Sequence, residues 1–313
     1  MQSKLGVLFF EPEMKYLVWG NESWTISAHA HGDVKVGGGI FAGKTLSRLW
    51  AEQPELFGLS RAGDAAVLQS RSRDDSSSVF PLLVKIITAN DDLSIQVHPD
   101  DAYSALHENG SLGKTECWYI LDCEADAKLV LGHNAKNKAE LAEMVESGQF
   151  TELIREVPVK QGDFIQMNPG TVHAIKGGIR LLEIQQSSDI TYRLYDYGRT
   201  VDGKPRELHL KKALDVIGCP APAASDSIIT AKERAVNQLN ELISCDYYKI
   251  WELSVSGQTT IIQNHPFLIV CVIAGEGEIG DEIIRADDHF ILPYGCGEVS
   301  FRGEMRLILA SGS

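Results

Sequence analysis

Gln96 and His98 stand two positions apart, shortly after the apolar, β-branched run 81–88 (Pro-Leu-Leu-Val-Lys-Ile-Ile-Thr). That run predicts a buried strand. Because alternate side chains of a strand share a face, Gln96 and His98 point into one space, while Ile95 and Val97 point the opposite way. An amide oxygen and an imidazole nitrogen can both bind a metal ion. The pair therefore predicts half of a coordination site.

Glu116 and His173 can complete that site. Glu116 lies in a second predicted strand, 115–121, and His173 follows the turn signal Asn-Pro-Gly at 168–170. The four residues offer oxygen and imidazole nitrogen ligands without a cysteine. This mix suits a Zn²⁺ ion with open coordination positions for water or substrate, and Fe²⁺, Co²⁺ or Mn²⁺ could substitute. We predict one Zn²⁺ per chain.

The elements that must position these residues are mostly short strands. Helical spacing is confined to residues 45–56, 101–107, 137–157 (in two pieces broken near Gly148) and 208–217. The segment 218–225 has the composition of a linker, and many short strands with turns follow it. The pattern predicts a mainly β protein with a few short helices and two domains, residues 1–217 and 226–313.

Composition excludes several classes of function. The 313 residues include 43 acidic and 29 basic side chains, a net charge of −14, which argues against nucleic-acid binding. A small anionic substrate stays possible, because a local cluster of Lys and Arg overrides the global field. No apolar run is long enough for a membrane span, and the six cysteines are scattered as in a reduced, cytoplasmic protein. The oligomeric state leaves no signal in the sequence.

Two motifs resemble those of the cupin superfamily. Gly162, Gly170 and His173 have the spacing of the second cupin motif, with the proline one place late. Gln96-Val97-His98 and Glu116 resemble the first motif, with glutamine in place of its first histidine and a longer insertion before the glutamate. This resemblance implies jelly-roll β-barrels.

The departures from the general cupin pattern point to one family. Gln-Val-His-Pro-Asp-Asp (96–101), Gly-Lys-Thr-Glu (113–116), Asn-Pro-Gly-Thr-Val-His (168–173) and Asp-Ile-Thr-Tyr-Arg (189–193) together resemble type I mannose-6-phosphate isomerase, above all its shorter bacterial form. The resemblance implies two cupin barrels, and Glu298 at the position of a metal histidine implies that the second is metal-free. It also implies interconversion of mannose 6-phosphate and fructose 6-phosphate by proton transfer between C1 and C2 through a cis-enediol.

The resemblance implies roles for four more residues. Arg193 matches the catalytic arginine near the reacting oxygens, and Lys114 matches a residue that contacts substrate through phosphate or hydroxyl. Lys85 is a further candidate for substrate binding, and a lysine inside an apolar strand needs a partner. Asp189 matches an acidic position and is a candidate base. A hydroxide held by the metal could serve instead, and the sequence does not choose between them.

Two other classes of function remain open at this stage. A cupin oxygenase would use Fe²⁺, but such sites are usually built on three histidines, which Gln96 argues against. A sugar-binding or regulatory cupin would keep the barrel and would need neither Arg193 nor Lys114 beside the metal ligands. Turnover of mannose 6-phosphate that is lost on chelation and restored by zinc separates the isomerase from both.

Overall fold

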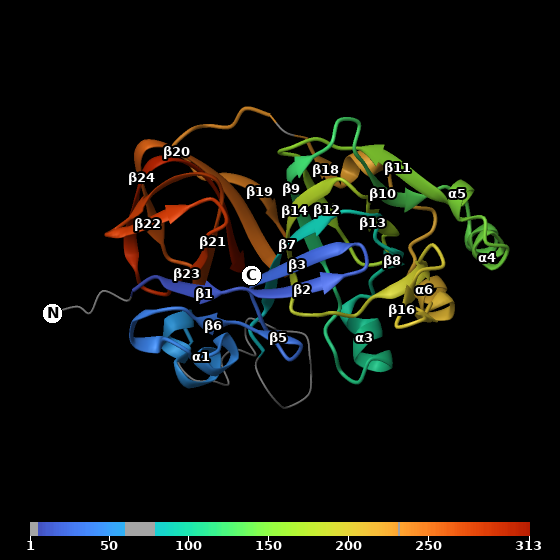
Figure 1. Ribbon diagram of the computed structural model, residues 1–313, viewed down its shortest axis with the longest axis horizontal. Coiled ribbons are helices and arrows are strands. Elements are labelled where there is room, and N and C mark those ends of the chain that lie inside the picture. The colour runs from blue at the N-terminus through green and yellow to red at the C-terminus, as the bar shows by residue number, and fades with distance from the viewer. Residues whose placement is uncertain (1–5, 60–78, 231) are drawn as a thin grey trace. The chain divides into compact units, whose positions relative to one another are not determined.

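Strands dominate the chain in a computed structural model that describes residues 6–59, 79–230 and 232–313 (Figure 1), so the expected mainly β class is confirmed. The described residues form two compact units. Unit 1 comprises 6–13, 24–59, 79–84 and 232–313, and unit 2 comprises 14–23 and 85–230. The predicted domain boundaries at residues 217 and 226 are not tested by this division and stay a prediction.

A seven-stranded sheet carries Glu116 and runs in the order β18-β12-β9-β14-β7-β3-β2. The expected strand 115–121 is confirmed as β9, which begins at Glu116 and pairs antiparallel with β12 and β14. The expected buried strand 81–88 is β7, and all but one of its residues are buried. The strands are β2 (Glu13–Leu17), β3 (Gly20–Ile26), β7 (Leu82–Ala89), β9 (Glu116–Cys123), β12 (Phe164–Met167), β14 (Ile179–Gln186) and β18 (Ile228–Ile229).

A five-stranded sheet of unit 2 carries the other predicted ligands and runs in the order β11-β10-β13-β8-β15. The strands β8 and β13 hold Gln96 and His173, and His98 follows β8 directly. The sheet consists of β8 (Ile95–Val97), β10 (Lys128–His133), β11 (Ile154–Pro158), β13 (His173–Ile175) and β15 (Tyr192–Tyr195). A two-residue ladder, β16 (Thr200–Val201) with β17 (Lys204–Pro205), follows β15.

Apolar side chains alternate with other side chains along the strands, so each sheet turns one apolar face toward the other sheet. Leu129 and Leu131 of β10 lie in one apolar cluster with Trp118 and Ile120 of β9, so the two sheets share a core. Val130, between the two leucines, points to the opposite face and joins the cluster beneath the helices. The two sheets therefore pack face to face across this apolar cluster.

Four helices accompany the five-stranded sheet: α3 (Asp101–His107), α4 (Lys138–Glu146), α5 (Phe150–Leu153) and α6 (Leu210–Val216) (Figure 1). Side-chain oxygens of Asp100 and Asn137 cap α3 and α4. The expected break near Gly148 separates α4 from α5. The helical span predicted to reach Val157 ends at Leu153, because the chain enters β11 at Ile154.

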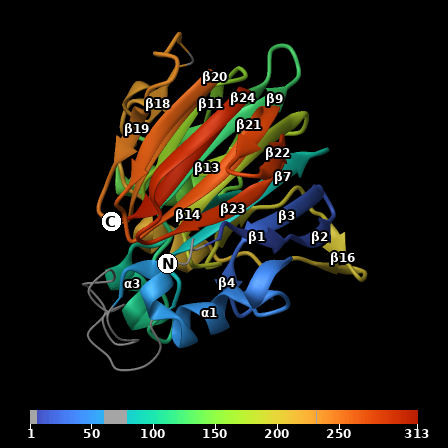
Figure 2. The same cartoon turned by 90° about the vertical axis from the view of Figure 1, so that its left-hand side faces the viewer.

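Unit 1 is built on an eight-stranded sheet in the order β19-β20-β24-β21-β23-β1-β6, with β22 beside β21. Figure 2 shows the long strands β20, β24 and β21 side by side. The N-terminal strand β1 pairs with β23 near the chain's other end. The strands are β1 (Leu8–Glu11), β6 (Lys35–Val36), β19 (Asn240–Ser244), β20 (Tyr248–Gln263), β21 (Phe267–Ile279), β22 (Glu282–Arg285), β23 (His289–Pro293) and β24 (Gly297–Gly312).

The remaining elements of unit 1 are short. The helical span expected over 45–56 is divided into α1 (Leu46–Glu52) and a 3₁₀ turn, η2 (Pro54–Phe57), because Pro54 has no N–H to continue an α-helix. The others are β4 (Ala28–His29), β5 (Gly32–Asp33) and η1 (Gly39–Phe41), while η4 (Ala224–Asp226) lies in unit 2. None of the six cysteines forms a disulfide. Within the described ranges, every helix is too short or too polar to cross a membrane.

Candidate metal centre

The predicted ligands lie on facing strands of the two sheets. In the five-stranded sheet, Gln96 on β8 pairs with His173 on β13 and, on its other side, with Arg193 on β15. Directly paired residues of antiparallel strands project to the same face, so these three side chains share the inner face. Glu116, at the start of β9, enters the same space from the seven-stranded sheet.

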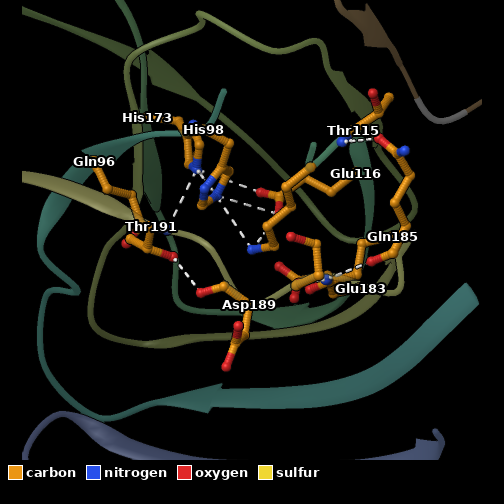
Figure 3. Close-up of polar contacts among 12 residues, drawn as sticks. Gln96, His98, Thr115, Glu116, His173, Glu183, Gln185, Asp189 and Thr191 are labelled. Atoms are coloured by element: carbon orange, nitrogen blue, oxygen red, sulfur yellow. Dashed lines mark hydrogen bonds and ion pairs between the residues drawn. The ribbon is translucent and has the colours of Figure 1, made fainter. Parts of the chain in front are cut away.

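Three of the ligands converge closely, as Figure 3 shows. The Nε2 atoms of His98 and His173 are 3.2 Å apart. Glu116 Oε2 lies 3.5 Å from His98 Nε2, and its Oε1 lies 3.4 Å from His173 Nε2. All three side chains are almost completely buried. His98, Glu116 and His173 thus form a group that could hold a metal ion, and their role as metal ligands stays a prediction.

Backbone carbonyl groups set the orientation of both imidazole rings. His98 Nδ1 donates to the carbonyl oxygen of Ile190 at 2.8 Å, and His173 Nδ1 donates to that of Thr171 at 2.9 Å. The Nε2 atoms then carry lone pairs that face the cluster, the arrangement typical of metal-binding histidines. Burial lowers the pKa of His173 to about 4 and that of His98 well below its usual value, so both rings are neutral at pH 7.

Glu116 is a buried carboxylate among these lone pairs. Burial raises the pKa of Glu116 to about 7, against the opposing effect of the Lys114 charge. Apart from the Lys114 ammonium group, which lies 2.7 Å from Oε2, no donor among the described residues bonds to its oxygens. A cation among two imidazole lone pairs and a carboxylate offsets their mutual repulsion, as the Lys114 ammonium group does from one side. The donor set therefore fits a metal ion with nitrogen and oxygen ligands.

Gln96 lies at the edge of the cluster. Its Nε2 is 3.4 Å from His173 Nε2, and its Oε1 accepts from Ser94 Oγ at 3.3 Å. A half-turn of the amide about its last torsion exchanges these atoms and presents the oxygen to the cluster. The structure thus brings Gln96 beside the other three ligands, and its role as a fourth ligand stays a prediction.

The turn before His173 is held against His98. Gly170 adopts a φ of +80°, which favours glycine, and its N–H donates to the carbonyl oxygen of His98 at 2.9 Å. A Cβ at this position would lie 2.8 Å from the carbonyl oxygen of Val216. The Asn168-Pro169-Gly170 signal therefore marks a turn whose backbone couples the two histidine-bearing segments.

Lys114 points its ammonium group into the cluster. Lys114 Nζ lies 2.7 Å from Glu116 Oε2 and donates to His98 Nε2 at 3.2 Å. Its side chain is buried. Lys114 is therefore held in the cluster and not on the surface, and its predicted contact with substrate stays a prediction. A fixed positive charge therefore stands next to the proposed ligands.

Lys85 has carboxylate partners of its own. Its Nζ is 2.9 Å from Glu183 Oε1 and 3.8 Å from Glu22 Oε2. Trp118 Nε1 donates to the second oxygen of Glu183 at 2.9 Å. Burial alone would raise the pKa of Glu183, but the charges of Lys85 and Lys114 lower it to about 2. Lys85 is therefore half of a buried ion pair, and its predicted contact with substrate stays a prediction.

Glu183 is a residue of the inner space that sequence reasoning missed. It pairs with Trp118 in the β14–β9 register, two positions from Gln185, which pairs with Glu116. An acidic residue within the strand-like run 179–185 was the available signal, because a buried carboxylate in a strand needs a partner. Lys85, singled out for the same reason, is that partner.

Arg193 and Asp189 differ in their placement. Arg193 is half-buried on β15 opposite Gln96, and its Nε is buried without a hydrogen-bond partner among the described residues. Burial and the nearby Arg206 charge lower the pKa of Arg193. Asp189 is exposed, and its carboxylate points away from the two histidines (Figure 3). The structure thus brings Arg193 to the inner face but leaves the Asp189 side chain outside the cluster.

Comparisons with known proteins agree on one family. The family described as "Phosphomannose isomerase type I, catalytic domain" matches residues 12–115, and "Mannose-6-phosphate isomerase, cupin domain" matches residues 238–311. Mannose-6-phosphate isomerase ManA of Bacillus subtilis is 43% identical over 326 residues, with 97% of this chain and 98% of the relative covered. Mannose-6-phosphate isomerase of Streptococcus mutans is 38% identical over 323 residues, with 96% of each chain covered.

A solved structure supports the same relationship. The crystal structure of the mannose 6-phosphate isomerase from Bacillus subtilis superimposes with a TM-score of 0.83 at 34% sequence identity. The superposition covers 97% of this chain and 99% of the other. Similarity therefore extends over the whole fold as well as over the motifs.

Proposed function

Because the chain belongs to the type I mannose-6-phosphate isomerase family, we propose that it interconverts mannose 6-phosphate and fructose 6-phosphate. The observation that carries the proposal is the convergence of His98, Glu116 and His173 with Lys114 in one buried space. The reaction moves a proton between C1 and C2 through a cis-enediol. It needs a base for the carbon-bound proton and positive charge beside the neighbouring oxygens.

The proposed metal is one Zn²⁺ ion, held by Gln96, His98, Glu116 and His173. Support comes from the neutral, oriented imidazoles and from the buried Glu116 carboxylate, to which Lys114 is the close donor among the described residues. When bound, zinc would polarise the sugar's carbonyl and hydroxyl oxygens as a Lewis acid. Structural zinc sites are mostly built on cysteine, so a set of nitrogen and oxygen ligands favours a catalytic site, in which a coordination position is available to substrate.

Lys114 and Arg193 supply the positive charge of the chain itself in this proposal. Lys114 Nζ lies 2.7 Å from Glu116 Oε2, so a sugar oxygen near this carboxylate would also lie near the ammonium group. Arg193 approaches from β15 with an Nε that has no partner among the described residues. A guanidinium group held there can donate to an oxygen that becomes negative as the proton leaves carbon.

Asp189 is proposed as the base and Lys85 as a contact for the substrate. Asp189 must turn its exposed carboxylate inward to reach a sugar bound at the cluster. Lys85 must share its ammonium group between Glu183 and a substrate oxygen, which three N–H donors permit. The sugar phosphate is the small-molecule partner in this proposal.

We also propose that the strands form two jelly-roll barrels of the cupin type. In unit 2, the support is a cluster shared by two facing sheets, with Glu116 on one and His98 and His173 on the other. In unit 1, the support is the antiparallel pairing of β20, β24, β21 and β23 around an apolar cluster. The family match at residues 238–311 names a cupin domain in that part of the chain.

A coupled assay tests the proposed function. Purified protein should convert mannose 6-phosphate to fructose 6-phosphate, lose activity with a chelator and regain it with Zn²⁺. Binding of the sugar phosphate without turnover, by protein shown to contain one metal ion per chain, would contradict the isomerase assignment. Mannose without its phosphate serves as the control substrate.

A further inference from the structure

Hydrogen bonds that belong to no sheet ladder or helix hold the backbone on both sides of Lys114. Gly113 N donates to Asp101 Oδ1 at 2.7 Å, and Thr115 N donates to Gln186 Oε1 at 2.8 Å. The N–H of Lys114 itself donates to the carbonyl oxygen of Pro99 at 3.0 Å. Three consecutive buried amides are thus satisfied just before the chain enters β9.

Asp101 and Gln186 also bind each other. Gln186 Nε2 donates to Asp101 Oδ1 at 3.0 Å, so one carboxylate oxygen accepts from both Gly113 and Gln186. Gln186 is buried. We call Asp101 and Gln186 the amide clip. Its two side chains come from the start of α3 and the end of β14, far apart in sequence.

Packing leaves this segment little room. A Cβ on Gly113 would lie 2.4 Å from the carbonyl carbon of Asp100 and 2.5 Å from the nitrogen of Asp101. Nearby, Ser188 Oγ donates to the carbonyl oxygen of Leu112 at 2.9 Å. Residues 112–113 therefore pack closely against the start of α3, and a hydrogen bond joins them to the chain after β14. Its position decides where the Lys114 side chain begins.

We propose that Asp101 and Gln186 are positioning residues that hold the Lys114 ammonium group between Glu116 and His98. The proposal rests on the isomerase function proposed above. Both side chains act through the backbone of residues 113–115, and the clip joins this segment to the start of α3, just after the His98 segment. A lysine side chain has four flexible carbon–carbon bonds, so its ammonium group keeps one position only if its backbone is fixed.

A simpler role for Asp101 is stabilisation of α3, because an acidic residue in the first turn favours a helix. Gln186 distinguishes the two roles, since it lies on β14 outside that helix. Asp100 supplies the matched control. It caps the same helix by accepting from Tyr103 N at 2.8 Å, and no bond joins it to the amides of residues 113–115 in the described contacts.

The first measurement is steady-state kinetics of Asp101→Ala and Gln186→Ala beside Asp100→Ala. Both clip variants should lose about 10- to 100-fold in kcat, as expected when a reacting group shifts by about 1 Å. Their KM should stay within about threefold of wild type and their metal content should not change. Asp100→Ala should keep wild-type kcat. Clip variants with the kcat of this control would overturn the proposal.

A second, independent experiment measures whether the effects of Gln186→Ala and Lys114→Ala on kcat add. In a Lys114→Ala background, adding Gln186→Ala should cause no further loss of kcat, because the clip acts through the side chain already removed. The same fold-loss in both backgrounds would overturn the proposal in favour of a general structural role. Gln186→Glu alone should lower kcat, because a second carboxylate would then face Asp101. Adding Asp101→Asn to Gln186→Glu should restore kcat, since the pair again consists of one amide and one carboxylate.

Hydrogen exchange of the peptide spanning residues 109–116 gives a readout that does not depend on turnover. Loss of either clip side chain should speed exchange in this peptide, and Asp100→Ala should leave it unchanged. Unchanged exchange in both clip variants would overturn the clip. A metal-loaded wild-type protein without isomerase turnover would instead overturn the proposed function, and the exchange result would still decide whether the clip holds the segment.

Discussion

The interiors of the two units differ in chemistry although both are built from antiparallel strands. In unit 2, inward-facing positions carry the charged or ligating side chains of Lys85, Lys114, Glu116 and Glu183 beside two histidines. In unit 1, β20, β21, β23 and β24 contribute mostly apolar side chains to one buried cluster, which includes Phe290 and Phe301. Side chains alternate between the two faces of a strand in both units. In unit 2 this alternation turns polar ligands inward, and in unit 1 it turns mostly apolar side chains inward.

The difference shows what each interior contributes. Burying apolar side chains stabilises a fold, whereas burying charges is costly unless each charge has a partner. In unit 2 the partners are present, as in Lys85 with Glu183 and Lys114 with Glu116. An interior with this cost is expected where positive charge and ligands are needed for chemistry. We expect changes in the apolar cluster of unit 1 to act on stability alone, and four predictions test that division of roles.

The largest effect is expected from removal of a ligand in unit 2. His98→Ala or His173→Ala should abolish bound metal and activity. The loss should exceed the about 10- to 100-fold caused by loss of a ligand's hydrogen-bond partner. Elemental analysis of the purified variants measures the metal. Full zinc content in either variant would refute the ligand set, and His265→Ala, in unit 1, is the matched control.

Truncation of the apolar interior should act on stability alone. Phe290 is fully buried and packs on Phe9 with ring centroids 4.9 Å apart. Phe290→Ala should lower the free energy of unfolding by about 3–5 kcal/mol because it leaves a cavity. The kcat of the folded, metal-loaded fraction should not change. Urea unfolding followed by fluorescence measures the first quantity, and Ile262→Ala, at an exposed position, should be neutral.

The sharpest functional test inside unit 2 is Arg193→Ala. Loss of a positioned donor to a developing oxyanion should reduce kcat about 100- to 1,000-fold, equivalent to about 3–4 kcal/mol, while metal stays bound. Kinetics and metal analysis on the same preparation separate these two effects. A kcat/KM within about twofold of wild type would remove Arg193 from the mechanism.

The smallest effect is expected at the position in unit 1 where a cupin metal histidine would stand. Glu298 is exposed on β24 and pairs with Ile262 on β20. Glu298→Ala should change stability by less than about 0.5 kcal/mol and leave metal content and activity as in wild type. Loss of metal from this variant would break the comparison, because it would place a ligand in the apolar unit.

Much of the candidate site was predictable from local pattern. The shared space of Gln96 and His98 follows from strand periodicity, and the turn at Asn168-Pro169-Gly170 follows from residue types. The mainly β class followed from the many short apolar runs. The motif spacing indicated the family, which the comparisons confirmed.

Other features had no local signal. Glu183 meets Lys85 across a sequence separation of 98 residues, and Gln186 meets Asp101 across 85. The pairing of β1 with β23 joins the two ends of the chain in one sheet, although the N-terminal strand alone indicates no partner. Propensity and periodicity describe neighbours along the chain, so they do not identify contacts at such separations.

The amino-acid sequence by itself determined which side chains can bind a metal and which face of each strand they occupy, because residue type and the period of two are local properties. Only the tertiary structure decided that His98, Glu116 and His173 come within 3.2 to 3.5 Å of one another. It also decided that Lys114 is fixed beside them while the Asp189 carboxylate faces outward. These outcomes depend on how two sheets pack, and packing is set by the whole apolar core rather than by any one motif.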